Sequence, residues 1–221
     1  MTYSLYYSLG AASMAVHWML IEMAIPFEVR LIDIDAGAQQ TDEYRRLNPS
    51  GRVPTLVVDG VARAESASLL MLLAERHPAA AFAPATGSSD RAEWLELMIY
   101  LANTLLPAMR DWFYAGVDGD LAGADAVRAL ARKRIEEAWN RLDKHLADGR
   151  VYFVGGMLST VDFLAVMLMR WSRNMARPAT NWQHLLPYIE RLRGLPSFIE
   201  VNAREGLTDW SNSAHSANRK I

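Results

Sequence analysis

The opening residues bring a strand, a glycine turn and a hydroxyl together within a few positions. The stretch YYSLGAAS, residues 6–13, is an apolar strand that runs into Gly10 and two alanines and then offers one hydroxyl, Ser13. A strand that stops where a helix begins is a common place for reactive chemistry, because the first amides of the helix and its positive dipole end favour an anion. Ser13 is therefore a candidate for chemistry, and the plainer alternative is a serine that only caps the helix.

Two further stretches contain residue types that suit ligand binding. In NPSGRVPTL, residues 48–56, Pro54 begins a strand and cannot donate to its ladder, which leaves the preceding carbonyl and amide free for a ligand. Further on, Glu65 and Ser66 stand at the start of a helix, where amide donors, a hydroxyl and the helix dipole can hold a carboxylate. The alternatives are an ordinary edge-strand proline and a simple helix cap.

The elements that must position these residues follow from hydrophobic periodicity and turn signals. Strands are expected over 3–8, 27–34, 53–60 and 61–64, helices over 12–24 and 65–77, and a short helix or loop over 38–47. The order βαβαββα begins with alternating strands and helices, which favours parallel pairing. Asp59-Gly60 is a hairpin signal, so the last two strands should pair antiparallel.

The rest of the chain is expected to be helical. Residues 78–90 are rich in Ala, Pro, Gly and Ser, which predicts a linker, so the domains are expected at 1–80 and 91–221 with a connection over 81–90. Helical periodicity covers 91–114, 124–146 and 160–175, and shorter helices follow over 186–194 and 196–205. STVD, Ser159 to Asp162, is a capping pattern and is interpreted as structural. His17 lies in an apolar helix, which favours a packed, hydrogen-bonded histidine over a ligand.

Composition excludes several classes of function. The 221 residues are 51% hydrophobic and 22% charged, with a net charge of −2, so no global field recruits nucleic acid or an anionic membrane. The absence of cysteine excludes disulfides, thiolate zinc sites and a cysteine nucleophile, and no metal is expected. No secretory signal and no membrane span are indicated, so the expected location is the cytoplasm.

With Val53-Pro54, Glu65-Ser66 and the α/β-then-α layout together, the chain resembles the cytosolic glutathione transferase superfamily over nearly its whole length. The resemblance implies an N-terminal thioredoxin-like domain that binds glutathione and an all-α helical-bundle domain with a hydrophobic-substrate pocket. It implies that Pro54 is cis and that Val53 pairs through its backbone with the cysteinyl part of glutathione. Glu65 and Ser66 would hold the γ-glutamyl end, and Arg52 would lie near the glycyl carboxylate.

The opening stretch is most similar to bacterial beta-type members, whose motif runs Tyr-x-Pro-Gly-Ala-Cys-Ser. Tyr7 matches the tyrosine, Leu9 replaces the proline, and Ala12 stands where that subgroup has its cysteine. Ser13 then becomes the best candidate for activating the thiol, with Tyr7 second. Only about one per cent of free glutathione is thiolate at neutral pH, and lowering its pKa by two units needs roughly 2.7 kcal/mol of preferential interaction with the anion. The helix over 91–114 has leucines where the subgroup has a histidine, with Asn103 the nearest polar residue.

The implied function is a glutathione transferase that activates the glutathione thiol and conjugates it to a hydrophobic electrophile, as in detoxification. The alternative is a non-catalytic glutathione-binding or protein-interaction module of the same fold. A third possibility, an aspartyl-phosphate phosphatase suggested by Asp33 and Asp35 after a strand, lacks a lysine in the right context and a later acidic pair. The resemblance also implies a homodimer, and the polar tail over 208–221 is expected to pack along the body or a partner subunit.

Overall fold

The structure is a computed structural model, and it describes residues 1–210. The expectation for the tail lies outside the described residues from 211 onward. The described chain divides into two compact units: Met1–Ala80 together with 190–210, and Ala81–Ile189. The first unit breaks after Ala80, and by their contacts residues 190–210 group with it, although they lie within the helical domain expected over 91–221.

The first unit is built on a four-stranded sheet with the order β2-β1-β3-β4. Its strands are β1 (Tyr3–Tyr7), β2 (Glu28–Leu31), β3 (Thr55–Val58) and β4 (Val61–Ala64). β1 pairs parallel with β2 and antiparallel with β3, and β3 pairs antiparallel with β4. Both pairing predictions are confirmed. The hairpin turn has Asp59 at φ 51° and Gly60 at φ 85°, the positive φ pair that an Asp-Gly turn between twisted strands requires.

Three helices connect these strands. They are α1 (Met14–Glu22), α2 (Asp42–Leu47) and α3 (Ser66–Arg76), with a 3-10 turn over Ala38–Gln40 before α2. Thr41 caps α2, because its side chain accepts from the Tyr44 N–H. The observed order, βαβαββα, is the order predicted for a thioredoxin-like domain. The strand β2 differs from expectation, because all four of its residues are exposed rather than alternating.

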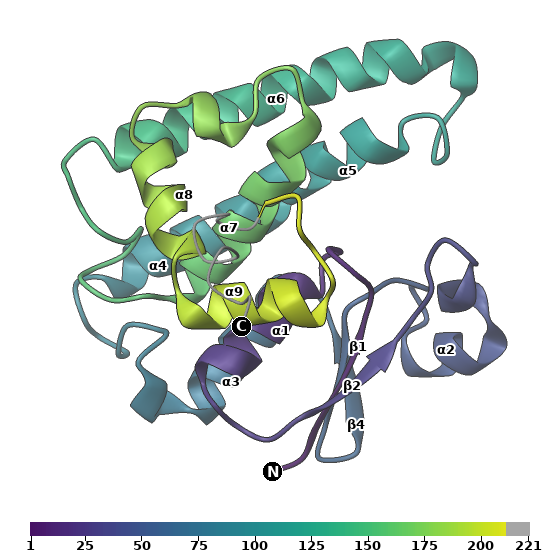
Figure 1. Cartoon of the computed structure of the whole chain (residues 1–221), viewed down its shortest axis with the longest axis horizontal. Coiled ribbons are helices and arrows are strands. Elements are labelled where there is room, and N and C mark those ends of the chain that lie inside the picture. The colour runs from purple at the N-terminus through teal and green to yellow at the C-terminus, as the bar shows by residue number, and fades with distance from the viewer. Residues whose placement is uncertain (211–221) are drawn as a thin grey trace, which may run out of the picture. The chain divides into compact units, whose positions relative to one another are not determined.

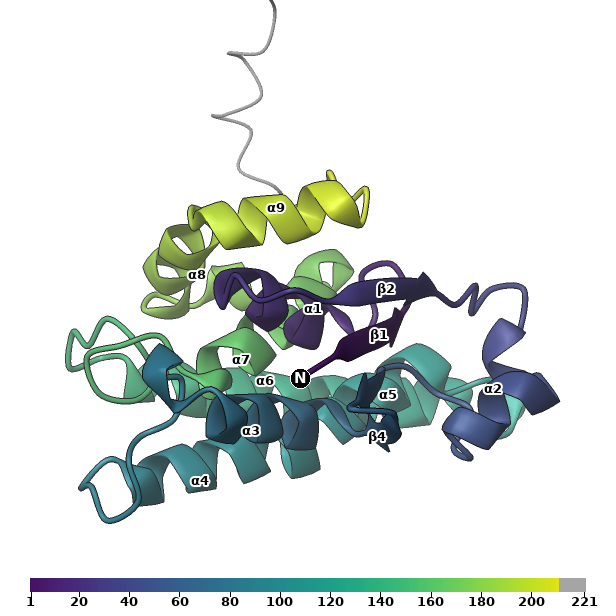
Figure 2. The same cartoon turned by 90° about the horizontal axis from the view of Figure 1, so that it is seen from below.

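The last helix of the described chain, α9 (Pro196–Arg204), packs against α1, and Figures 1 and 2 both place the two helices side by side. The ring centroids of Trp18 and Phe198 lie 4.9 Å apart in an edge-to-face arrangement. Trp18 Nε1 donates to Ser197 Oγ at 2.8 Å. Residues 14–20 of α1 are all buried. A helix that is apolar on every side needs partners on every side, and α9 supplies the partner that the sheet cannot.

The second unit is helical. It contains α4 (Arg91–Tyr100), α5 (Leu106–Tyr114), α6 (Ala124–His145) and α7 (Thr160–Trp171), and α8 (Leu185–Arg193) crosses the boundary between the units. The single helix predicted over 91–114 is interrupted by a π-helical turn over Leu101–Leu105. No strand is assigned between 91 and 210, as predicted.

The predicted cap of α7 and part of the linker pack together in the second unit. Asp162 is fully buried and accepts the Ser159 N–H at 2.8 Å and the Ser159 hydroxyl at 2.9 Å, so the predicted link between these two residues is confirmed. The Phe82 carbonyl accepts the Thr160 N–H at 2.9 Å, and the Phe82 ring meets Phe163 edge-on at 5.2 Å. Phe82 is therefore an ordered part of this unit rather than free linker.

Two further findings concern the described residues only. None of their helices is both long and apolar enough to cross a membrane. They also hold no group of three or more His, Cys, Asp or Glu side chains placed to bind a metal ion.

Candidate functional site

The turn between β1 and α1 is stabilised by the buried hydroxyl of Ser13, which bonds to the backbone of Ser8. The Ser13 side chain is fully buried, and its hydroxyl donates to the Ser8 carbonyl at 3.1 Å and accepts the Ser8 N–H at 3.1 Å. The Ala11 N–H also donates to the Ser8 carbonyl, at 3.2 Å. Ser13 is the N-cap residue of α1 by position, but its side chain makes no capping hydrogen bond. The one proton of Ser13 is therefore directed at Ser8, and whether it also serves a thiol stays a prediction.

Tyr7 stands at the end of β1 on the face that carries Tyr3 and Leu5, and it is nearly buried. Its ring meets the His17 ring edge-on at 5.3 Å. Burial, with a smaller contribution from the negative charge of Glu205, raises the pKa of Tyr7 above its ordinary value. Tyr7 therefore keeps its proton at neutral pH, and its hydroxyl can donate a hydrogen bond.

The loop before β3 presents Val53 beside a cis peptide bond. The Val53–Pro54 bond is cis, as the family resemblance implied. The Arg52 carbonyl is held by the Tyr44 hydroxyl at 2.8 Å and by the Asn48 side-chain amide at 2.7 Å. These bonds fix the loop through Arg52, and the Val53 amide and carbonyl have no hydrogen-bond partner among the described residues. The Arg52 side chain is exposed and has no ion pair among the described residues.

Glu65 and Ser66 lie at the start of α3. Glu65 occupies the N-cap position with φ 70°, and its exposed side chain makes no capping bond, which leaves its carboxylate available. Ser66 is buried, and its hydroxyl donates to the Ala12 carbonyl at 2.9 Å. This bond joins the start of α3 to the turn before α1, so two of the predicted segments are neighbours in the first unit.

The site therefore offers open backbone groups together with the Glu65 carboxylate and the hydroxyls of Ser13 and Ser66. The N–H groups of Ala12 and Ser13 have no hydrogen-bond partner among the described residues. Amides at a helix start attract negative charge, and the free backbone of Val53 can pair with an extended peptide. The Glu65 carboxylate can pair with an ammonium group. A short peptide can meet all of these groups. Its amine would pair with the Glu65 carboxylate, its backbone with that of Val53, and an anionic group such as a thiolate with the open amides.

Several residues that support the site were not predicted from the sequence. Tyr44 and Asn48 hold the Arg52 carbonyl, and Glu205, just after α9, contacts both Gly10 and His17. His17 itself is buried and hydrogen-bonded, as predicted. The one signal for a partner was α1 itself, a mostly apolar helix with His17 inside it, which required a covering element. Nothing in the sequence marked the particular carboxylate.

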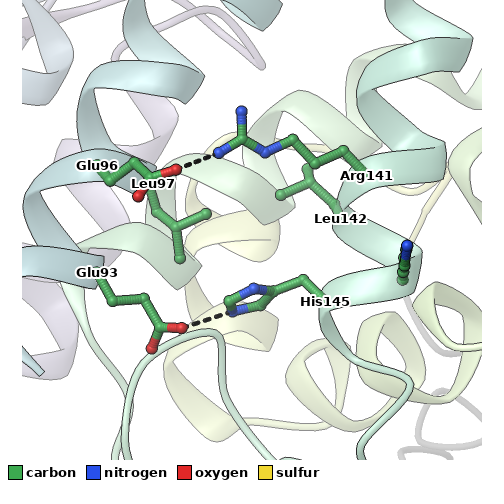
Figure 3. Close-up of a pocket in the computed structure, with 7 residues that line it drawn as sticks. Glu93, Glu96, Leu97, Arg141, Leu142 and His145 are labelled. Carbon is green, nitrogen blue, oxygen red and sulfur yellow. Dashed lines mark hydrogen bonds and ion pairs between the residues drawn. The ribbon is translucent and has the colours of Figure 1, made fainter.

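One pocket in the second unit is lined mainly by polar and charged side chains. A pocket of about 250 Å³ lies between α4 and α6. Glu93 Oε1 lies 3.7 Å from His145 Nε2, and Glu96 Oε1 lies 2.5 Å from Arg141 Nη2. Figure 3 shows both pairs facing each other across the pocket. The remaining lining residues are Leu97, Leu142 and Lys144. Asn103 is exposed in the π-helical turn. The apolar electrophile pocket expected in this domain stays a prediction.

The chain matches two known family models, one in each half. The model for the glutathione S-transferase N-terminal domain matches residues 11–76, and the model for the C-terminal domain matches residues 125–210. The fold is that of a two-domain protein with a thioredoxin-like half and a helical half. The chain belongs to the cytosolic glutathione S-transferase superfamily.

Individual relatives agree with this assignment. A glutathione S-transferase of Xanthomonas campestris pv. campestris is 27% identical over 85% of this chain and 91% of its own length. A maleylacetoacetate isomerase of Dictyostelium discoideum is 28% identical over 87% of this chain and 89% of its own length.

Solved structures are similar as well. A sphingomonad glutathione S-transferase complexed with glutathione has a TM-score of 0.81 and 28% identity, and covers 93% of this chain and 100% of its own. A bacterial beta class enzyme of Sphingomonas chungbukensis has the same TM-score and coverage at 26% identity. The cysteine that marks the beta-type motif is absent here, where Ala12 stands.

Proposed function

We propose that this protein binds glutathione in the first unit, stabilises its thiolate at the start of α1 and conjugates it to a hydrophobic electrophile. The observation that carries the proposal is the hydrogen bond from the Ser66 hydroxyl to the Ala12 carbonyl. It sets the segment proposed to hold the γ-glutamyl end beside the turn proposed to hold the sulfur. A glutathione complex is known for a relative of 28% identity, which supports the same ligand here.

Each predicted residue has a role in this proposal. Val53 pairs through its amide and carbonyl with the cysteinyl backbone, and cis Pro54 shapes the loop that presents it. Glu65 binds the α-ammonium group, Ser66 lies at the γ-glutamyl carboxylate, and Arg52 lies near the glycyl carboxylate. These are complementary charges at both ends of the tripeptide, which fixes its direction in the site.

The thiolate is stabilised at the start of α1 by donors from the protein. The open amides of Ala12 and Ser13 and the helix dipole favour the anion. Ser13 and Tyr7 are the two hydroxyls proposed to donate to it. Tyr7 keeps its proton, and Ser13 must share the proton that it gives to Ser8.

Thiolate formation tests these roles directly. The ultraviolet absorbance of bound thiolate is measured against pH for wild type, Ser13→Ala and Tyr7→Phe. Loss of a donor to sulfur should raise the pKa of the bound thiol by about one unit, which corresponds to roughly 1.4 kcal/mol. An unchanged pKa in one variant would remove that hydroxyl from the mechanism, and an unchanged pKa in both would leave activation to the backbone amides.

The reaction itself is separated from its alternatives by two measurements. Calorimetric titration with glutathione up to millimolar concentration tests binding, and no detectable binding would end the proposal. A panel of electrophiles then tests turnover by loss of total thiol, since conjugation consumes glutathione. Binding without turnover would favour the non-catalytic module. Isomerisation of a substrate double bond at constant total thiol would favour an isomerase, an alternative suggested by the Dictyostelium relative.

The assembly and location are further proposals. Leu95 and Ile99 leave α4 with 40% and 55% of their surface exposed, which suits a helix covered in a homodimer. Light scattering on the purified protein tests this, and a monomeric mass at micromolar concentration would contradict it. A cytoplasmic location is expected, as implied by the family resemblance.

A further inference from the structure

Glu205 is a buried carboxylate that the proposed mechanism does not use. It directly follows α9, is 1% exposed, and its own N–H donates to the Val201 carbonyl at 2.9 Å. A carboxylate is costly to bury unless it is paired and hydrogen-bonded, so its partners explain its presence.

The carboxylate has two hydrogen-bond partners from the first twenty residues of the chain. One oxygen, Oε2, accepts the Gly10 N–H at 2.7 Å, and the other, Oε1, lies 2.8 Å from His17 Nδ1. Gly10 has φ 62°, which places it in the left-handed region at the tip of the turn between β1 and α1. One side chain from the end of the described chain thus spans the turn and the second turn of α1.

The turn is consequently held from two sides. Ser13 bonds the Ser8 amide and carbonyl from inside, and Glu205 bonds the Gly10 amide from the α9 side. The amides that follow Gly10, those of Ala12 and Ser13, have no partner among the described residues. Hydrogen-bond donors stabilise an anion best when their orientation is already fixed before it binds, because the protein then does not have to reorganise.

We propose that Glu205 is a positioning residue for the glutathione thiolate: its hydrogen bond to the Gly10 amide fixes the turn that aims the amides of Ala12 and Ser13, just before α1, at the sulfur. This inference rests on the proposed function. Glu205 touches neither the substrate nor the reacting sulfur. The effect comes from the hydrogen bond and not from the charge, because a negative charge near the turn would oppose a thiolate.

A matched pair of variants isolates the hydrogen bond. Glu205→Gln and Glu205→Met both remove the charge and have similar size, but only glutamine keeps an oxygen that can accept the Gly10 N–H. The glutamine amide can also donate to His17 Nδ1. We expect kcat/KM for glutathione to be at least tenfold lower in Glu205→Met than in Glu205→Gln, the loss that follows when a buried donor is left unpaired. We also expect the pKa of the bound thiol to be about one unit higher in the methionine variant.

Ser197→Ala is the control for helix docking. Ser197 links α9 to α1 through Trp18 and Glu22, remote from the turn. Its replacement should lower the melting temperature while leaving the bound-thiol pKa at the wild-type value. If Glu205→Met does not fold, Glu205→Asp takes its place against wild type, since it keeps the charge but is one methylene too short to hold both partners, and the same tenfold loss is expected.

The outcomes are distinct. Equal kcat/KM and equal thiol pKa in the Gln and Met variants would overturn the positioning role, as would a thiol pKa raised equally by Ser197→Ala. Failure of the wild-type protein to bind glutathione would instead end the proposed function, and with it the premise of this inference. If the wild-type protein binds glutathione and catalyses its reaction while the Gln and Met variants have the same kcat/KM and thiol pKa, the proposed function stands. Only the role of Glu205 is then refuted.

Discussion

At the scale of single residues, the site depends on hydroxyls that the fold already uses. Ser13 and Ser66 are both buried, and each donates its proton to a backbone carbonyl of the same turn, that of Ser8 and that of Ala12 respectively. While its proton goes to the Ala12 carbonyl, the Ser66 hydroxyl can only accept from a ligand, so it must turn away from Ala12 to donate to the γ-glutamyl carboxylate. Its main contribution is to keep the start of α3 against the turn before α1.

The neighbouring serine of α3 gives a matched test of this contribution. Ser66→Ala removes the bond to Ala12 and should weaken glutathione binding about tenfold, the effect of losing one buried hydrogen bond near a ligand. Ser68→Ala lies in the same first turn of α3, but Ser68 is exposed, so binding should change less than about twofold. Isothermal titration of the three proteins compares them. Equal affinities for wild type and Ser66→Ala would show that the contact with Ala12 does not shape the site.

Tyr7 predicts a specific dependence of stability on alkaline pH. Its pKa is raised in the folded protein, chiefly by burial, so the unfolded chain loses the Tyr7 proton first as the pH rises. The stabilisation is complete below the unfolded pKa of about 10 and is lost progressively above it. Tyr7→Phe should therefore lose less unfolding free energy between pH 9 and pH 11 than wild type.

Denaturant titration at a series of pH values measures this difference. Tyr44 and Tyr100 also have raised pKa values, but both are present in the two proteins and their contributions cancel in the comparison. Parallel curves for wild type and Tyr7→Phe over this range would contradict a raised pKa at Tyr7.

At the scale of elements, the features predicted correctly are those that depend on residues close together in the sequence. The Asp59-Gly60 pair sets the hairpin through its own backbone angles, and the link between Ser159 and Asp162 spans only three residues. The π-helical turn over Leu101–Leu105 was not predicted, because the apolar pattern of 91–114 continues through it. The exposure of β2 was also missed, since alternation in the sequence cannot tell an edge strand from a half-buried one.

The candidate site divides in the same way. The positions of Val53-Pro54 and Glu65-Ser66 follow from short motifs, and the bond from Ser66 to Ala12 places the second of these at the turn before α1. The bond partners of Ser13 were not predicted, because a serine before a helix suggests a cap and the sequence cannot reveal the buried bonds to Ser8. Glu205 acts on residues almost the whole chain away, and no spacing rule connects them.

The cap of α7 yields a prediction of its own. Asp162 is fully buried and accepts four donors, from the Ser159 amide and hydroxyl, the Phe153 amide and the Tyr188 hydroxyl. Asp162→Asn replaces one accepting oxygen with a donor and leaves buried partners unpaired, so it should lower the free energy of unfolding by about 3 kcal/mol or more. Asp120→Asn, at the exposed cap of the 3-10 turn Leu121–Gly123, should cost less than about 1 kcal/mol. Denaturant titration of both variants checks the contrast, and similar losses would refute it.

At the scale of the whole molecule, the two ends of the described chain belong to one unit. The sheet and its helices come from residues 1–80, and α9 returns from beyond residue 190 to cover α1. Composition placed α9 in the helical domain, and the family model for the C-terminal domain also runs through α9 to residue 210, whereas the contacts of α9 with α1 group it with the first unit. The core of the first unit therefore depends on apolar contacts made by the last helix, above all that between Trp18 and Phe198.

This dependence predicts which amides lose protection when either core is weakened. Phe198→Ala removes a buried ring that packs on Trp18 and should cost about 3–5 kcal/mol. Hydrogen exchange should accelerate first in β1, β3 and α1, although the substitution lies more than a hundred residues away in sequence. Phe163→Ala is the reciprocal control, because Phe163 is equally buried but packs on Phe82 in the second unit. Its loss should expose the amides of α4 and α7 first. Faster exchange in the second unit alone after Phe198→Ala would mean that α9 does not stabilise the sheet domain, because local opening follows the contacts that hold each unit together.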